Sequence, residues 1–440
     1  MHICQYRESD GMRTDNQIQK KRRDFLKTTA AGSAVALTGL SGCIGSTDDD
    51  GGDGEDGGTT DDGTDFDEVT LGVLEPFTGD FAELATERNQ GETLAIDQVN
   101  ASDEYDFEFN VAEYDTQLSS EDGVQAAKDA IESDGAQFLT GAISSSVALA
   151  INEVAANQQV VYTPGAADVS ITGSNCNEYV FRFETNTAQI AEVTTQWLAD
   201  KGWTNLHYQI ADYAYGDSVL EEVDSRMSER SGDYERLGTT RSAPAAQNFD
   251  SAITEIEENV DAADALVVGA TGGHLIRFLV QAAGRGLKED IPIVTTTGSF
   301  RVVRGGAGSA AYDVYSGTRY VPSIDTGTNP QFVEDYQAEY DAPPDNFSRV
   351  GYGSVLMLAN GIQEAGSKDP DDVRDVLPGM THETIFGDVA FRECDQQASN
   401  PVWMGQNVAP EEGETAAVEL LRNLDGEAAQ PACDTTGCEL

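Results

Sequence analysis

The chain has 440 residues, of which 26 are Lys or Arg and 78 are Asp or Glu, so its formal net charge is −52 at pH 7. This negative charge argues against nucleic acid or an anionic membrane surface as a partner, because both would repel the protein. The length is sufficient for two domains, each with a core of its own.

The first 42 residues are typical of an export signal. The basic group Lys20–Arg23 precedes an uncharged stretch from Thr28 to Gly42, which is shorter than the roughly 20 residues of a membrane helix. RRDFLK resembles a twin-arginine signal, and LSGC resembles a lipobox that ends in Cys43. We therefore predict export, lipidation of Cys43 and anchoring to the outer face of the cell membrane. The alternative is a buried amphipathic helix in which the cysteine is incidental.

Residues 43–68 form an acidic segment rich in Gly and Thr. Between Ser46 and Glu68 there are 11 carboxylates and no basic residue. Such a composition cannot bury enough apolar area to offset its conformational entropy. We predict a flexible tether between the lipid and a globular body that begins near Val69.

From Val69 onward, apolar runs alternate with helical patterns in two series. The first series has the predicted strands VTLGVL, FEFNVAEYD, AQFLTGAIS and QVVYTPGAAD. The helix between the last two is expected to bury one face, formed by Val147, Ile151 and Val154. The second series has the strands NLHYQIAD, ADALVVGATGG and IPIVTTTG, and a helix whose inward residues are predicted to be Leu275, Ile276, Leu279, Val280 and Ala283.

Continuous apolar strands that alternate with helices predict parallel sheets covered on both faces. We therefore predict an α/β fold with two doubly wound lobes. In such sheets ligands bind beyond the carboxyl ends of the strands. The loops there are rich in hydroxyl and backbone N–H groups, which suit a small polar ligand: EPFTG, GAISSS, TPGAAD, ADYAYGD, GATGG and TTTGS.

In this order, the segments resemble the solute-binding proteins of ABC importers typified by the leucine/isoleucine/valine-binding protein. The resemblance runs from about Val69 to Pro410 and rests on GVLEPFTGDFAELA, EYDTQ, TGAISSSVALA, YTPGAAD, YVFR, ADYAYGD and FGDVAFRECDQQ. It implies a type I periplasmic binding fold, in which three crossovers join two lobes that close over a ligand. The implied boundaries are 69–184 plus 320–394 for lobe one, 185–319 plus 395–425 for lobe two, and 426–440 for a C-terminal tail.

The resemblance also implies which residues bind the ligand. Ile143, Ser144 and Ser145, at the start of a helix, would hold a ligand carboxylate, although these serines could instead only cap the helix. Tyr215 would reach the ligand from the second lobe. The other implied contacts are Phe77, Leu84, Gly165, Ala166, Ala167, Asp168, Thr271 and Thr297.

Three positions depart from the amino acid binders of this family. Ala167 replaces a threonine, a tyrosine is missing near Thr271, and Thr297 replaces the glutamate that pairs with the ligand ammonium. A buried ammonium needs a carboxylate or several oxygens, so Asp168 or Asp212 would have to supply it. If neither faces the cleft, the ligand lacks an ammonium group. The resemblance thus leaves two ligand classes open, an apolar amino acid such as a branched-chain one, or another carboxylate, an aromatic acid or an amide.

Four cysteines remain in the body, and an exported chain permits disulfides between them. Of the three possible pairings we favour Cys176–Cys394 with Cys433–Cys438. The CDTTGC segment has no metal-binding spacing, and we predict neither a metal nor a cofactor.

The sequence lacks a nucleophile elbow, a P-loop and a dinucleotide-binding motif, so we do not expect an enzyme. The expected partners are a small-molecule ligand and the permease and ATPase subunits of an ABC importer, with the membrane reached only through the lipid. A sensor for a membrane chemoreceptor is the alternative. The acidic composition is similar to that of halophilic proteins, whose carboxylates are screened by concentrated salt.

Overall fold

Four parallel strands form the first of two sheets. In a computed structural model, which describes residues 67–410 and 417–440, this sheet has the order β2-β1-β3-β4. Its strands are β1 (Glu68–Glu75), β2 (Glu108–Asp115), β3 (Phe138–Gly141) and β4 (Val161–Pro164). The helices between them are α2 (Ala82–Ala101), α3 (Ser120–Glu132) and α4 (Ser145–Gln158).

The predicted signal of residues 1–42, Cys43 and the tether up to residue 66 lie outside the described residues. Within residues 67–410 and 417–440, no helix is both long enough and apolar enough to cross a membrane. Export and lipidation therefore stay predictions.

Side chains of β1 alternate between two cores. Val69, Leu71 and Val73 pack with α2, whereas Leu74 packs with side chains of α3 and α4. All four are almost completely buried. The strand buries apolar side chains on both sides because helices cover both faces of the sheet.

The second sheet has seven strands in the order β13-β12-β9-β8-β7-β5-β6. Its parallel strands are β5 (Asn205–Ala211), β6 (Glu235–Ser242), β7 (Ala265–Gly269), β8 (Ile293–Thr295) and β9 (Tyr315–Thr318). Its helices are α5 (Thr187–Lys201), α6 (Ala214–Arg230), α7 (Asp250–Glu257), α8 (Gly272–Gly284), α9 (Leu287–Asp290) and α10 (Arg301–Ala307), followed by the 3-10 helix η3 (Gly308–Ala311).

One strand of the second sheet runs against all the others, whereas the sequence pattern predicted parallel strands only. β12 (Val402–Val408) runs antiparallel to both β9 and β13 (Ala417–Leu424). Eight residues separate β12 from β13. This is fewer than the dozen or so that a crossover between parallel strands needs, so the pair must be antiparallel.

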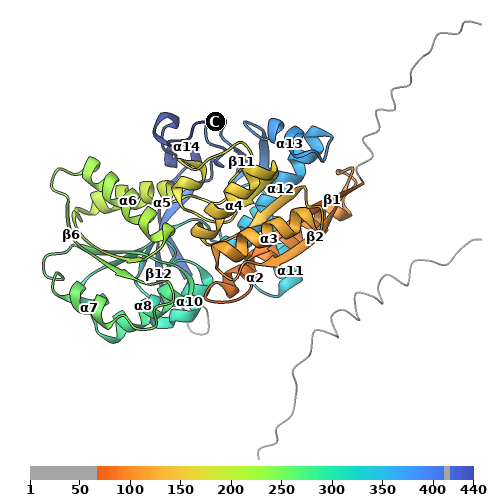
Figure 1. Cartoon of the computed structure of the whole chain (residues 1–440). Helices are drawn as coiled ribbons and strands as arrows, with labels where there is room; N and C mark the ends of the chain where they lie inside the picture. The colour runs from red at the N-terminus through yellow and green to blue at the C-terminus, as the bar shows by residue number, and fades with distance from the viewer. Residues whose placement is uncertain (1–66, 411–416) are drawn as a thin grey trace, which may run out of the picture. The chain divides into compact units, whose positions relative to one another are not determined.

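The chain passes between the sheets three times, after β4, after β9 and before β12. After β9 it returns to the first lobe. There it forms α11 (Asn329–Tyr340), α12 (Asn346–Ala365), α13 (Pro370–Val376) and the hairpin β10 (Thr381–Thr384) and β11 (Gly387–Ala390). In Figure 1 these blue elements lie with the orange strands β1 and β2, and α12 packs on α2.

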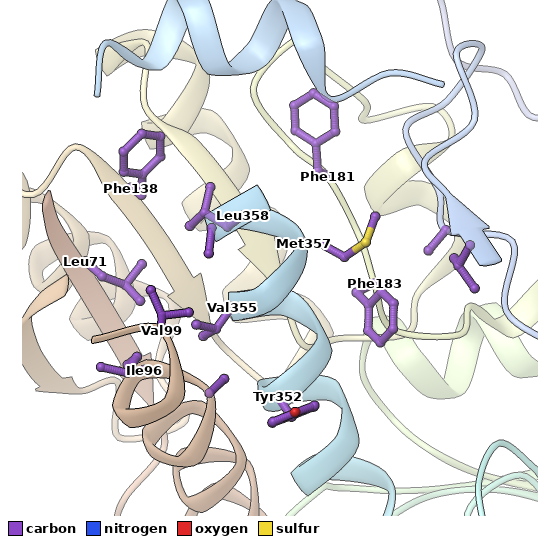
Figure 2. Packing of buried hydrophobic residues seen from close by; sticks show 14 of the residues in the cluster. Leu71, Ile96, Val99, Phe138, Phe181, Phe183, Tyr352, Val355, Met357 and Leu358 are labelled. Atoms are coloured by element: carbon purple, nitrogen blue, oxygen red, sulfur yellow. The ribbon is translucent and has the colours of Figure 1, made fainter. Parts of the chain in front are cut away.

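Helix α12 is at the centre of the first lobe's core. Figure 2 shows Val355 and Leu358 on the side of α12 that faces Val99 of α2, whereas Met357 lies toward Phe183. All five side chains are buried. A helix that is apolar on several sides is expected in such a buried position.

Two disulfides tie the C-terminal segment, which contains α14 (Gly426–Ala429), to the rest of the body. Cys176 is bonded to Cys438 and Cys394 to Cys433, with Cα–Cα distances of 5.5 and 5.9 Å. The favoured pairing, Cys176–Cys394 with Cys433–Cys438, is wrong. Cys433 is the first residue of the 3-10 helix η4 (Cys433–Thr435), and Cys438 follows that helix. The two cysteines bond to cysteines in different loops, so their closeness in sequence did not indicate their partners.

Candidate ligand-binding site

Loops at the carboxyl ends of strands from both sheets meet around one small cavity. Ten residues line it: Ile143, Gly165, Ala167, Tyr213, Tyr215, Thr271, Thr297, Phe300, Arg319 and Phe347. The cavity measures about 10 Å³, which is about the room that one water molecule needs. The two lobes are therefore closed on each other, and any larger ligand requires them to move apart.

Six of the residues predicted to bind the ligand line this cavity: Ile143, Gly165, Ala167, Tyr215, Thr271 and Thr297. Four others belong to the same loops without lining it: Ser144, Ser145, Ala166 and Asp168. Leu84 lies in the buried apolar cluster that also holds Ile143, and Phe77 packs against that cluster. Contact of these residues with a ligand stays a prediction.

The two serines bond differently from helix caps. Ser144 occupies the N-cap position of α4, but its side chain makes no capping hydrogen bond. The Ser145 hydroxyl accepts a hydrogen bond of 3.3 Å from the backbone N–H of Asp168, which joins the loops after β3 and β4. The first turn of α4 is thus left without a side-chain acceptor from Ser144, as at helix termini that bind anions.

The two carboxylates considered as ammonium partners point elsewhere. Asp168 Oδ1 accepts hydrogen bonds of 2.8 and 2.7 Å from the backbone and hydroxyl of Ser170, and so caps the 3-10 helix η2 (Val169–Thr172). Asp212 is exposed and lies 3.2 Å from Arg241. Neither lines the cavity, and none of the ten lining residues is Asp or Glu.

Arg319, which the sequence analysis missed, is the only charged residue among those ten. Its Nη1 donates to Glu184 Oε1 at 2.7 Å, and its Nη2 donates to Tyr215 Oη at 2.9 Å. The rings of Phe300 and Tyr215 lie 5.3 and 5.9 Å from the guanidinium carbon. The cation is thus held between one carboxylate and two aromatic rings, and is almost completely buried.

Two arginines share the Glu184 carboxylate, since Arg349 Nη2 lies 3.4 Å from its Oε2. Burial lowers the pKa of Arg349 to about 10, against the opposing effect of Glu184, so the side chain stays protonated near neutral pH. Burial raises the pKa of Tyr215, although Arg319 acts in the opposite direction, so its phenol is neutral there. The groups around the cavity therefore carry more positive than negative charge.

Four lining residues were missed by sequence reasoning: Tyr213, Phe300, Arg319 and Phe347. Two of them had a signal, since Tyr213 belongs to the quoted ADYAYGD loop and Phe300 directly follows TTTGS. The other two lie at the end of β9 and the start of α12, where the chain returns to the first lobe. Strand ends of the two predicted series could not indicate them.

Two ion pairs join the lobes near the cavity. Asp80 of the first lobe lies 2.7 Å from Arg277 of α8, and Glu87 of α2 pairs with Arg301 of α10. Burial and the neighbouring Asp345 raise the pKa of Glu87 to about 8, against the opposing effect of Arg301. These pairs are made only when the lobes are closed.

Among the described residues, no group of three or more His, Cys, Asp or Glu side chains could hold a metal ion. His207, His274 and His382 are all absent from the cavity lining. The cavity lining therefore combines hydroxyl, aromatic and guanidinium groups and includes no histidine.

The model of the periplasmic binding protein family matches residues 68–413. The chain belongs to this family. As a periplasmic binding protein it is an α/β protein of two lobes that binds a small molecule, and it is not an enzyme.

Known relatives of this periplasmic binding protein are distant in sequence. The Leu/Ile/Val-binding protein homolog 3 of Brucella melitensis is 24% identical over 352 residues, which cover 76% of this chain and 89% of that protein. The fold is similar to that of an amino acid ABC transporter substrate-binding protein from Pseudomonas fluorescens, with a TM-score of 0.76, 24% identity, and coverage of 85% of this chain and 99% of the other. It is also similar to that of a solute-binding protein from Rhodopseudomonas palustris in complex with 3,4-dihydroxybenzoic acid, with a TM-score of 0.74, 21% identity, and coverage of 82% and 98%.

Proposed function

We propose that this protein is an exported, lipid-anchored receptor that captures a small organic solute and delivers it to the permease and ATPase subunits of an ABC importer. The observation that carries the proposal is the convergence of loops from both lobes on one small cavity. Lobes that part and close around a solute give a permease two distinguishable forms to recognise. The names of similar structures, which describe substrate-binding proteins of ABC transporters, support this partner.

The cavity favours a solute without an ammonium group over an amino acid. The amino acid is supported by the Leu/Ile/Val-binding name of a relative. The other class is supported by a similar structure that holds 3,4-dihydroxybenzoic acid, and by the absence of Asp and Glu from the cavity lining. A buried ammonium without a carboxylate partner would cost several kcal/mol.

Calorimetry on the purified protein in multimolar salt tests solute capture. The panel is leucine, 4-methylpentanoate, its amide, benzoate and benzamide. We expect saturable binding of at least one member at one site per chain. Heats of dilution alone across the whole panel would contradict the function.

The anchor is tested separately through Cys43. Cys43→Ser should release the protein from the cell membrane into the medium, because the thiol to be lipidated is gone. Fractionation of cells and medium measures the result. In a second variant, the joint changes Arg22→Lys and Arg23→Lys should block export. Membrane retention of the Cys43→Ser protein would contradict the lipoprotein assignment.

A further inference from the structure

We infer that Arg319 is the anchor for an anionic ligand, and that the captured solute is a small organic carboxylate with an apolar body and no ammonium group. The inference rests on the proposed function, since it takes the cavity at the strand ends as the solute site.

One of the three guanidinium nitrogens of Arg319 is left without a hydrogen-bond partner by the described residues. The two terminal nitrogens bond to Glu184 and Tyr215, whereas Nε has no hydrogen-bond partner among the described residues. Only 1% of the residue's surface is exposed, so bulk water does not supply an acceptor. A buried donor without an acceptor costs free energy, which an oxygen of a bound carboxylate would recover.

Thr271 supplies a second unused polar group on the same cavity. Its hydroxyl is buried and has no hydrogen-bond partner among residues 67–410 and 417–440. Thr271 is the N-cap residue of α8, where its side chain makes no capping bond. A hydroxyl can donate to the second oxygen of a carboxylate. The residues that line the cavity thus include two buried donors without a partner, one of them charged.

The local charge agrees with an anion. Glu184 is shared by Arg319 and Arg349, so the pair of cations keeps an excess of one positive charge. Behind the loop after β4, the buried Arg182 donates to two backbone carbonyl groups of that loop. In a dry cavity such an arrangement stabilises a negative ligand group and repels an ammonium. This local positive charge is opposite in sign to the net charge of the whole chain, which is −52.

The remaining walls are apolar and aromatic. Phe300 and Phe347 pack edge to face with their ring centres 5.4 Å apart, and Ile143, Gly165, Ala167 and Tyr213 also line the cavity. The hydroxyl groups of Tyr215 and Thr297, the other two lining residues, are already bonded to Thr296 and to the Ala270 carbonyl group. Aromatic walls suit an aromatic or branched aliphatic body. The ligand therefore has a carboxylate at one end and an apolar group at the other.

Matched ligands test the inference on the unaltered protein. We expect benzoate or 4-methylpentanoate to bind at least about 10-fold more tightly than the corresponding amide, because one charge-assisted hydrogen bond is lost in the amide. Leucine is expected to bind more weakly than 4-methylpentanoate, since only leucine carries an ammonium group. Tighter binding of leucine or of the amides would leave solute capture standing and overturn the carboxylate inference. Binding by no member of the panel would overturn solute capture itself, and this inference with it.

Variants then assign the effect to Arg319. Arg319→Gln should weaken carboxylate binding by about 10- to 100-fold and amide binding by clearly less, because an uncharged amide oxygen makes a weaker hydrogen bond to a guanidinium than a carboxylate does. The matched control is Arg349→Gln, because Arg349 is equally buried and pairs with the same Glu184 but does not line the cavity. Because Arg349 contributes to the same positive excess, this control should lose part of the preference for acid over amide, but less of it than Arg319→Gln, which also loses the direct hydrogen bond to the ligand. Equal losses for acid and amide in Arg319→Gln would show a purely structural role and overturn the inference.

A third variant keeps the test decisive if the Gln variant does not fold. Arg319→Lys retains a positive charge at the cavity wall, so the preference for the carboxylate over its amide should survive at reduced affinity. Loss of that preference in a folded Arg319→Lys protein, or its absence in the unaltered protein, would overturn the inference.

Discussion

Asp168 and Ser145 lie in neighbouring loops of the binding site, but their side chains make different hydrogen bonds. The Asp168 carboxylate is tied to Ser170, whereas the Ser145 hydroxyl accepts from the Asp168 backbone. We therefore expect Asp168→Asn, which keeps a capping acceptor, to leave ligand affinity unchanged. Calorimetry with the best-binding acid of the panel measures this. A large loss of affinity would show that the Asp168 carboxylate reaches the ligand.

Ser145→Ala should weaken a bound carboxylate by about 1 kcal/mol, because one hydroxyl at the predicted docking loop is removed. Neither serine lines the cavity, but the Ser145 hydroxyl bonds to the loop after β4, whereas Ser146 is the next residue on the same helix, so Ser146→Ala is the control. The measurement is the affinity of each variant for the same acid. Identical affinities in the two variants would remove Ser145 from the site.

Glu87 predicts a pH dependence of the closed form. Its pKa is raised to about 8 by burial and by Asp345, from an ordinary value of 4.5. The closed form therefore binds this proton more tightly than the unfolded chain does. Its contribution to stability is complete below about pH 4.5 and is lost as the pH rises toward 8.

We accordingly expect the thermal midpoint of the free protein to fall between pH 5 and pH 8, and to fall less in Glu87→Gln. Thermal melting at several pH values in constant multimolar salt measures how the midpoint changes with pH in the unaltered protein and in Glu87→Gln. Asp97→Asn on the same helix is the control, because Asp97 is exposed and is not among the charges that shift the pKa of Glu87. Parallel slopes for the unaltered protein and Glu87→Gln would contradict the assignment.

At the scale of elements, two glycines allow the backbones of α2 and α12 to touch. A Cβ atom on Gly91 would lie 1.9 Å from the Ser348 carbonyl oxygen, and one on Gly351 would lie 2.3 Å from that of Arg88. Gly351→Ala should therefore lower the free energy of unfolding by about 1–3 kcal/mol or more, because neither backbone can yield easily. Denaturant unfolding in high salt measures it.

The control for this prediction is Gly305→Ala in α10, where an added Cβ would meet no atom within 4 Å. That variant is expected to be neutral or slightly stabilised, since Ala is a better helix former than Gly. If Gly351→Ala unfolds at the same denaturant concentration as Gly305→Ala, the close approach of the two helices is wrong.

Helical patterns in the sequence predicted element type better than orientation. In α4 the predicted face is correct, because Val147, Ile151 and Val154 are all buried. In α8 the prediction that Val280 points inward is wrong, since 47% of it is exposed, and Phe278 is buried instead. Apolar residues surround most of α8, so periodicity allowed more than one inward face. Packing against the second sheet decided between them.

For the whole molecule, charge predicts a requirement for salt. Within the chain, 78 acidic residues face 26 basic ones, and their repulsion is screened only at high ionic strength. We expect the thermal midpoint to rise steeply between low and multimolar KCl. An equal rise in sucrose, or a midpoint that is independent of salt, would contradict electrostatic repulsion as the cause.

The sequence by itself determined the α/β class, the two series of strands and helices and the loops that hold seven of the ten cavity residues. These features depend on local periodicity and on the rule that parallel strands end at one edge. Only the tertiary structure decided that Arg319 lines the cavity, that Asp168 turns away from it and that Cys176 meets Cys438. Each of these depends on which groups are brought together by the packing of the lobes and by side-chain hydrogen bonds. Neither the packing nor these hydrogen bonds produce a periodic pattern in the sequence.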